Sequence, residues 1–168
     1  MAELDQIWMD LLDQASLRAI ENGQHRVADY LRLKLANDTI RQAGVDWLFQ
    51  TLIDQASAAS KDQPQLRIDR VSPHSFKIGT SNMVGSLIQV QHGVRCVSLE
   101  AGWVRTPSDG IMRNSALAHA RIKHFGMASE DNEFRLIRGE PLPLWIDEEG
   151  AEIRADDIHR HLQIVLSH

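Results

Sequence analysis

Cysteine is nearly absent from this chain, which has one, Cys96, among 168 residues. A single cysteine excludes an internal disulfide and a cysteine-based zinc site, and it gives no sign of an oxidising compartment. Cys96 lies in an apolar run with no evident base beside it. We therefore interpret Cys96 as a small buried hydrophobic residue and not as a reactive thiol.

Long hydrophobic runs are also missing. No window approaches the roughly 18 consecutive apolar residues of a membrane-spanning helix. The first residues carry acids where a secretory signal would carry positive charge. We therefore expect a cytoplasmic protein with no membrane partner.

The common local signatures of catalysis and cofactor binding do not occur. The sequence has no phosphate-binding glycine loop ending in Lys-Ser/Thr, no GxGxxG, no GxSxG and no HExxH. His159 and His161 are two residues apart, so on a helix they point to different sides and cannot hold one ion; we interpret them as surface residues. The sequence therefore predicts no cofactor and no metal site, although many enzymes lack local motifs.

Size and composition are those of one ordinary globular domain, with 43% hydrophobic and 24% charged residues. The polar stretch 60–65 reads as a short linker. We therefore predict a single domain over 1–168, with a helical subregion at 1–60 and a sheet-containing subregion at 66–168.

The first third of the chain has apolar residues at three- and four-residue steps, which is typical of amphipathic helices. We predict one helix that ends at Asn22-Gly23, a second from about 24 to 42, and a third from Asp46 to about 59 after a break at Gly44.

Beyond residue 65 the hydrophobic period changes to two, which indicates strands. The pattern predicts strands at 66–71 and 74–78, and a hairpin of 84–91 and 94–104 around His92-Gly93, with Ile88 opposite Val97. It also predicts a helix at 112–125, strands at 134–138 and 142–146, and a last helix at 155–167 with Ile158, Leu162 and Val165 inward. Trp8, Trp47, Trp103 and Trp145 are predicted in the core or at its edge.

The order of these elements is not the strict alternation of a doubly wound fold. It favours an α+β class: an N-terminal helical layer packed on a mainly antiparallel sheet, with one helix inserted after the central hairpin and a C-terminal helix.

Charge is distributed unevenly along the chain. Residues 64–125 contain eight Lys/Arg against three Asp/Glu, a net charge of +5, whereas residues 1–63 carry −4 and residues 126–168 carry −6. If 112–125 is a helix, its solvent side carries a basic group suited to phosphate or carboxylate. The candidate ligand-binding residues are Arg105, Arg113, His119, Arg121 and Lys123. The alternative is that these residues form an ordinary charged, solvated helix face, and that the acidic flanks of the same molecule lie against it.

These observations favour a non-catalytic binding or adaptor protein that recognises an acidic or phosphorylated partner. Nucleic acid is disfavoured, because the chain is acidic overall and only 5% aromatic. One alternative is a small enzyme at the 104–113 turn, where Arg105 binds an anionic substrate and His119 or Asp109 acts as acid or base. The other is a structural subunit that forms a homo-oligomer through its N-terminal helices.

Overall fold

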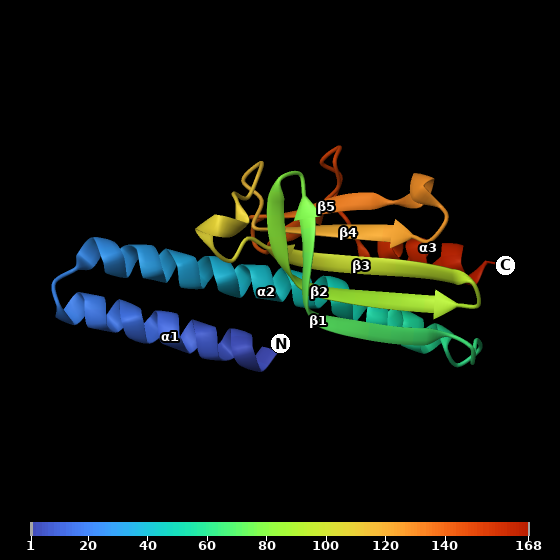
Figure 1. Ribbon diagram of the computed structural model, residues 1–168, viewed down its shortest axis with the longest axis horizontal. Coiled ribbons are helices and arrows are strands. Elements are labelled where there is room, and N and C mark those ends of the chain that lie inside the picture. Colours follow the sequence, from blue (N-terminus) through green and yellow to red (C-terminus); the bar gives the residue numbers. More distant parts are fainter. Residues whose placement is uncertain (1, 168) are drawn as a thin grey trace. The chain divides into compact units, whose positions relative to one another are not determined.

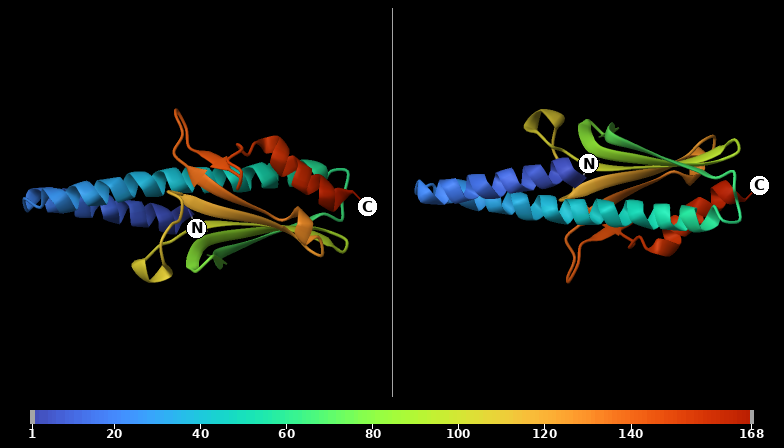
Figure 2. Two further views of the ribbon diagram at one scale, coloured as in Figure 1. Left: turned by 90° about the horizontal axis from the view of Figure 1, so that it is seen from above. Right: turned by 90° about the horizontal axis from the view of Figure 1, so that it is seen from below.

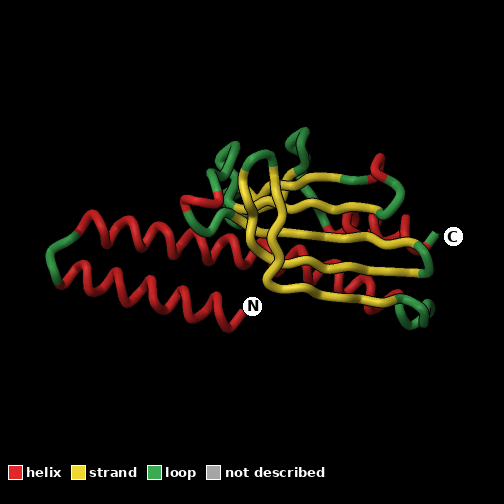
Figure 3. The backbone as a smooth tube through the Cα atoms, in the orientation of Figure 1, coloured by secondary structure: helices red, strands yellow, loops and turns green. Residues whose placement is uncertain are grey.

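The computed structural model describes residues 2–167, with side chains described from residue 6 onward. Three helices and one six-stranded antiparallel sheet confirm the predicted α+β class (Figure 1, Figure 3). The elements in chain order are α1 (Ala2–Glu21), α2 (His25–Ala59), β1 (Arg67–Ile78), β2 (Ser81–His92), β3 (Arg95–Trp103), β4 (Ala118–His124), β5 (Asn132–Ile137), β6 (Leu144–Ile146) and α3 (Ala155–Leu166). In residues 2–167 no helix is both long and apolar enough to cross a membrane.

The chain divides into two compact units, residues 1–43 and 44–168. The boundary falls inside α2, so each unit contains part of that helix. The single-domain organisation stays a prediction.

The first unit is an antiparallel pair of helices. Gly23 adopts the left-handed conformation, with φ of +71°, and closes α1 where the sequence predicts. Small side chains let the helices approach: Ser16 and Ala19 of α1 and Ala28 of α2 are buried, and Ser16 Oγ donates to the Ala28 carbonyl at 3.4 Å.

The predicted break at Gly44 is wrong, because α2 continues through it to Ala59. A Cβ on Gly44 would lie 2.5 Å from Cδ2 of Leu136, so the missing side chain lets helix and sheet approach. The indole Nε1 of Trp145 donates to the Gly44 carbonyl at 2.9 Å. Gly44 is therefore a packing residue in the second unit and not a helix terminator.

The strands follow one another in the sheet in chain order, β1 to β6. The central hairpin exists, but the predicted register is wrong by two residues: Ile88 pairs with Leu99, and Val90 with Val97. A shift of two keeps each side chain on its predicted face. The two predicted strands at 66–71 and 74–78 are one strand, β1, with an irregularity between Val71 and His74.

The predicted helix at 112–125 is also wrong. Residues 118–124 form β4, which pairs with β3 and β5, and only a short 3₁₀ turn, Pro107–Asp109, precedes it. Ala118, Ala120 and Ile122 alternate with polar residues and are buried, which is the period of a strand.

The C-terminal part of α2, together with α3, covers one face of the sheet within the second unit (Figure 2). The core between these layers contains buried residues from every layer: Leu48, Leu52, Ile88, Val97, Leu99, Ile122, Leu136, Trp145, Ile158 and Leu162. Ile158, Leu162 and Val165 of α3 point inward as predicted.

The tryptophans divide into two pairs. Trp103 and Trp145 are buried as predicted. For Trp8 and Trp47 the prediction is wrong, because they are 44% and 42% exposed.

Candidate functional site

The sheet face opposite the helices is polar. Strand alternation places on it the residues that lie between the core positions of β3, β4 and β5: Cys96, Ser98, Glu100, Gly102, His119, Arg121, Lys123, Glu133 and Arg135. Cys96 is partly buried here, and burial raises the pKa of its thiol, which disfavours the reactive thiolate.

The far end of the β1–β2 hairpin bends away from the plane of the other strands (Figure 1). Gly85 of this hairpin pairs with Gly102 of β3. A Cβ on Gly85 would lie 1.8 Å from the Ala101 carbonyl oxygen, so no side chain fits there. Beyond the bend, Phe76 and Met83 are buried in a small second core.

Glu100 is the centre of an ion-pair network on this face. Its side chain is almost fully buried, and Oε1 accepts hydrogen bonds from Arg121 Nη2 at 2.6 Å and from Nε at 2.9 Å. Oε2 lies 2.8 Å from His74 Nε2, and Lys123 Nζ lies 3.9 Å from Oε1. Arg121 also lies 3.7 Å from Glu133. The charge of Arg121 is thus largely balanced by carboxylates of its own chain.

His119 and Arg135 are directly opposed on β4 and β5. Within residues 2–167, two buried nitrogens of this pair, His119 Nε2 and Arg135 Nε, have no hydrogen-bond partner. His119 is 7% exposed. Burial, and secondarily the charge of Arg135, lowers the pKa of His119, so the imidazole is neutral at pH 7. Leaving buried polar atoms unpaired costs free energy, and such atoms are therefore candidate ligand contacts.

These two side chains line a cleft of about 300 Å³. Arg113 contributes a third cationic or titratable group, and its guanidinium lies against Gly79 and donates to Thr80 Oγ1 at 3.2 Å. Asn114, beside it, has φ of +55°, which is uncommon outside glycine and stores local strain. The wall also carries the carboxylates of Glu133, Asp147 and Glu148.

The structure separates the five predicted ligand-binding residues. Arg113 and His119 line this cleft, whereas Arg121 and Lys123 line a second hollow of about 290 Å³ that shares Glu133 and Glu148 with it. The guanidinium of Arg105 lies 3.7 Å from the centre of the Trp103 ring and lines neither.

Arg135 was missed by the sequence analysis. The signal was the alternation of Ala118, Ala120 and Ile122 with His119, Arg121 and Lys123, which indicates a strand. A strand at 118–124 would have brought its polar side chains next to those of the predicted strand at 134–138.

Asp109 has a structural role in the 104–113 turn. Its Oδ2 accepts from Thr106 N at 3.0 Å and from Thr106 Oγ1 at 2.9 Å, and Oδ1 accepts from Asn82 at 3.2 Å. These bonds, first of all the one from Asn82, lower the pKa of Asp109. Both carboxylate oxygens are therefore used in holding the turn.

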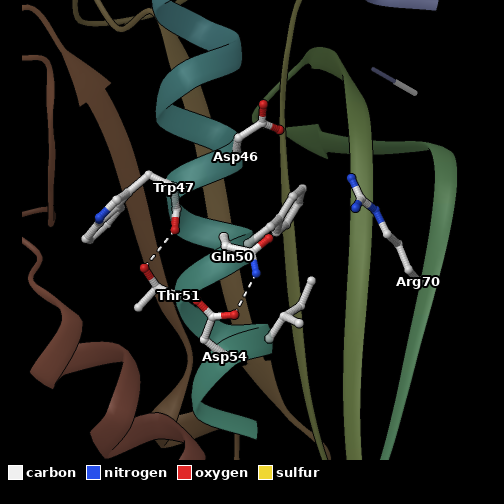
Figure 4. A pocket seen from close by; sticks show the side chains of 8 residues that line it. Asp46, Trp47, Gln50, Thr51, Asp54 and Arg70 are labelled. Atoms are coloured by element: carbon white, nitrogen blue, oxygen red, sulfur yellow. Dashed lines mark hydrogen bonds between the residues drawn. The ribbon is translucent and has the colours of Figure 1, made fainter. Parts of the chain in front are cut away.

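A larger hollow, about 590 Å³, lies beside α2 (Figure 4). Asp46, Trp47, Gln50 and Asp54 of α2 line it, with Arg70 from β1 on the other side. Gln50 donates to Asp54 at 2.6 Å, so these two polar groups bond each other. The His119 cleft, with its unpaired buried nitrogens, is the stronger candidate.

His161 differs from its prediction, because it is buried and not on the surface. Its Nδ1 lies 2.9 Å from His124 Nε2, and its Nε2 lies 3.3 Å from Asn132 Nδ2. Among the described residues, no group of three or more His, Cys, Asp or Glu side chains is arranged to hold a metal ion.

Comparison of the chain with protein-family models, with curated proteins and with solved structures found no match in any of the three.

Proposed function

We propose that this protein is a non-catalytic binding module that takes a phosphate or carboxylate group of its partner into the cleft formed by Arg113, His119 and Arg135. The observation that carries the proposal is the pair of buried nitrogens, His119 Nε2 and Arg135 Nε, that have no hydrogen-bond partner in residues 2–167 and belong to side chains that line a cleft. An anion can accept from Arg135 Nε, and from His119 Nε2 when that nitrogen carries a proton, which would satisfy two polar atoms that the fold leaves unpaired.

The charges of the cleft favour binding of a single anionic group inside it over binding of a broad acidic surface of the partner. Arg113 and Arg135 are cationic, but the carboxylates of Glu133, Asp147 and Glu148 share the lining. Two of these are engaged elsewhere: Glu133 lies near Arg121, and Asp147 accepts backbone N–H bonds from Glu149 and Ala151. Guanidinium groups are the donors best matched to phosphate and carboxylate oxygens.

Contacts within the chain reduce the number of predicted ligand-binding residues that are available for the anion. Arg121 is bonded to Glu100, Lys123 Nζ lies 3.9 Å from the same carboxylate, and Arg105 stacks on Trp103. The proposal therefore rests on Arg113 and His119 from that set, together with Arg135. A cytosolic location is part of the proposal, since the single cysteine fits a reducing compartment.

Calorimetric titration with inorganic phosphate and with acetate tests the proposal. We expect saturable binding of at least one anion to the unaltered protein and a loss of at least about tenfold in affinity for Arg135→Gln, since a hydrogen bond to a charged group contributes roughly 1.5–3 kcal/mol. Arg154→Gln is the matched control, because Arg154 is exposed and pairs with Glu152 outside the cleft. Absence of binding, or equal losses in both variants, would exclude the proposed site.

Proton linkage gives a second readout. An anion beside His119 favours its charged form, so binding should raise the lowered pKa of His119 and take up a proton. With acetate, which stays ionised in this range, affinity should therefore increase as the pH falls towards about 6, and His119→Gln should remove that dependence. A pH dependence that His119→Gln leaves unchanged would contradict the role of His119.

A further inference from the structure

The helical pair formed by residues 1–43 exposes an apolar face. Ile7, Trp8 and Leu11 lie within about 100° of one another around α1, because successive helical residues are turned by roughly 100°. All three are exposed, as are Val27 and Tyr30 of α2.

These five exposed residues share one side of the pair. Lys34 follows Tyr30 by four residues and Val27 by seven, so the three lie on one stripe of α2. Lys34 Nζ lies 5.9 Å from the centre of the Trp8 ring, which places this stripe beside the exposed residues of α1. We call Ile7, Trp8, Leu11, Val27 and Tyr30 the hairpin face.

The hairpin face is large for a surface without a partner. Five large side chains that are about half exposed present roughly 500 Å², near the upper end of apolar patches on monomers. A stable dimer buries about 800 Å² on each partner, with an apolar centre and a polar rim. The hairpin face has the area of such a centre.

The charges of the two helices are complementary. From residue 2 to residue 21 the sequence has five acidic residues and one basic residue, a net charge of −4. From residue 25 to residue 43 it has four basic residues and two acidic ones, a net charge of +2 with neutral histidine. A helical pair with this pattern is attracted to a second copy when α1 of one copy lies on α2 of the other.

We propose that two copies of this chain associate through the hairpin face as a four-helix bundle, with α1 on the partner's α2 and the two-fold axis running along the helices. The alternative two-fold axis, across the helices, would stack α1 on α1 and bring two charges of −4 together. In the proposed arrangement Glu21 and Arg26, which flank the α1–α2 turn, lie at the height of Arg26 and Glu21 of the partner copy. This inference does not depend on the anion cleft, which lies wholly within residues 44–168.

Sedimentation equilibrium of the full chain over a range of micromolar concentrations tests the dimer. We expect a monomer–dimer equilibrium, and Leu11→Glu should raise the dissociation constant at least about tenfold by placing a charge in the apolar centre. Leu17→Glu is the matched control: Leu17 is also exposed on α1, but it points roughly 120° away from Leu11 and should leave the constant within about twofold. Circular dichroism checks that both variants keep their helices.

Charge reversal separates a second copy from any other partner. Arg26→Glu should weaken the dimer, at least about threefold for a rim ion pair, and adding Glu21→Arg to the same chain should restore it. A monomer at every concentration overturns the proposal. So does equal weakening by Leu11→Glu and Leu17→Glu, or a double variant no tighter than Arg26→Glu alone.

Discussion

The buried pair of His124 and His161 should make the folded state sensitive to acid. His161 is 2% exposed, and Asn132 Nδ2 donates to its Nε2, so Nδ1 carries the proton and donates to His124 Nε2. Both rings are neutral in this arrangement. Protonation of either ring would place an extra hydrogen where the ring must accept a hydrogen bond.

The magnitude follows from the pKa of His161. Burial, then the neighbouring His124 and Arg160, lowers that pKa from 6.5 to about 4. Because the unfolded chain binds this proton more readily than the folded one, the stabilisation is complete above pH 6.5 and is lost as the pH falls towards 4. Each pH unit in that window is worth about 1.4 kcal/mol, so His161 accounts for roughly 3 kcal/mol, a large share of the about 5–15 kcal/mol typical of a domain.

Urea denaturation followed by tryptophan fluorescence, repeated across this pH window, measures the effect. In His161→Gln the side-chain amide can make the same two hydrogen bonds without titrating. The free energy of unfolding of this variant should therefore fall less in acid than that of the unaltered protein, by roughly 2–3 kcal/mol at about pH 4. His159→Gln is the control, since His159 is exposed on the same helix and bonds only Gln163 among the described contacts. If His161→Gln and the unaltered protein lose the same free energy in acid, the assigned cause is incorrect.

Three further predictions concern stability. Gly44→Ala should lower the free energy of unfolding by about 1–3 kcal/mol, because the new Cβ would lie 2.5 Å from Leu136 Cδ2; a thermal denaturation curve at or above that of the unaltered protein would contradict this. Trp145→Phe should cost about 1–3 kcal/mol in urea denaturation, since the Gly44 carbonyl loses the indole donor and the smaller ring leaves a gap in the core; an unchanged midpoint would show that the indole contributes nothing. Glu100→Ala should lower the free energy of unfolding by about 2 kcal/mol, less than for a fully buried pair because Arg121 is partly exposed. The double variant Glu100→Ala with Arg121→Ala should then lose less than the sum of the two single losses, and strict additivity would argue against coupling of the two residues.

Local pattern was sufficient for the parts of the fold in which chain neighbours decide the conformation. The α+β class, the turn at Asn22-Gly23, the existence of the central hairpin and the inward side of α3 were all predicted. In each case a short segment carries the information: a left-handed glycine, a period of two between turn residues, or apolar residues at helical spacing. The faces of the hairpin were also predicted correctly, because its register error was an even number of residues.

Tertiary contacts decided the rest. Gly44 has the local signal of a helix end, but α2 continues through it. Leu136 lies where a side chain at this position would be, and the Trp145 indole donates to the Gly44 carbonyl, so glycine is used here for packing. The segment 118–124 has the alternation of a strand, but its polar residues also fit helical stripes, and pairing with β3 and β5 decides in favour of the strand.

The candidate site depends on that same choice. As a helix, 112–125 would have presented Arg113, Arg121 and Lys123 together; as a strand it places Arg121 on Glu100 and His119 opposite Arg135. Sequence alone determined which charged residues the chain has and the layers from which it is built. Which of those charges are neutralised and which remain unpaired was decided by long-range strand pairing, because residues distant in sequence become neighbours only when the sheet forms.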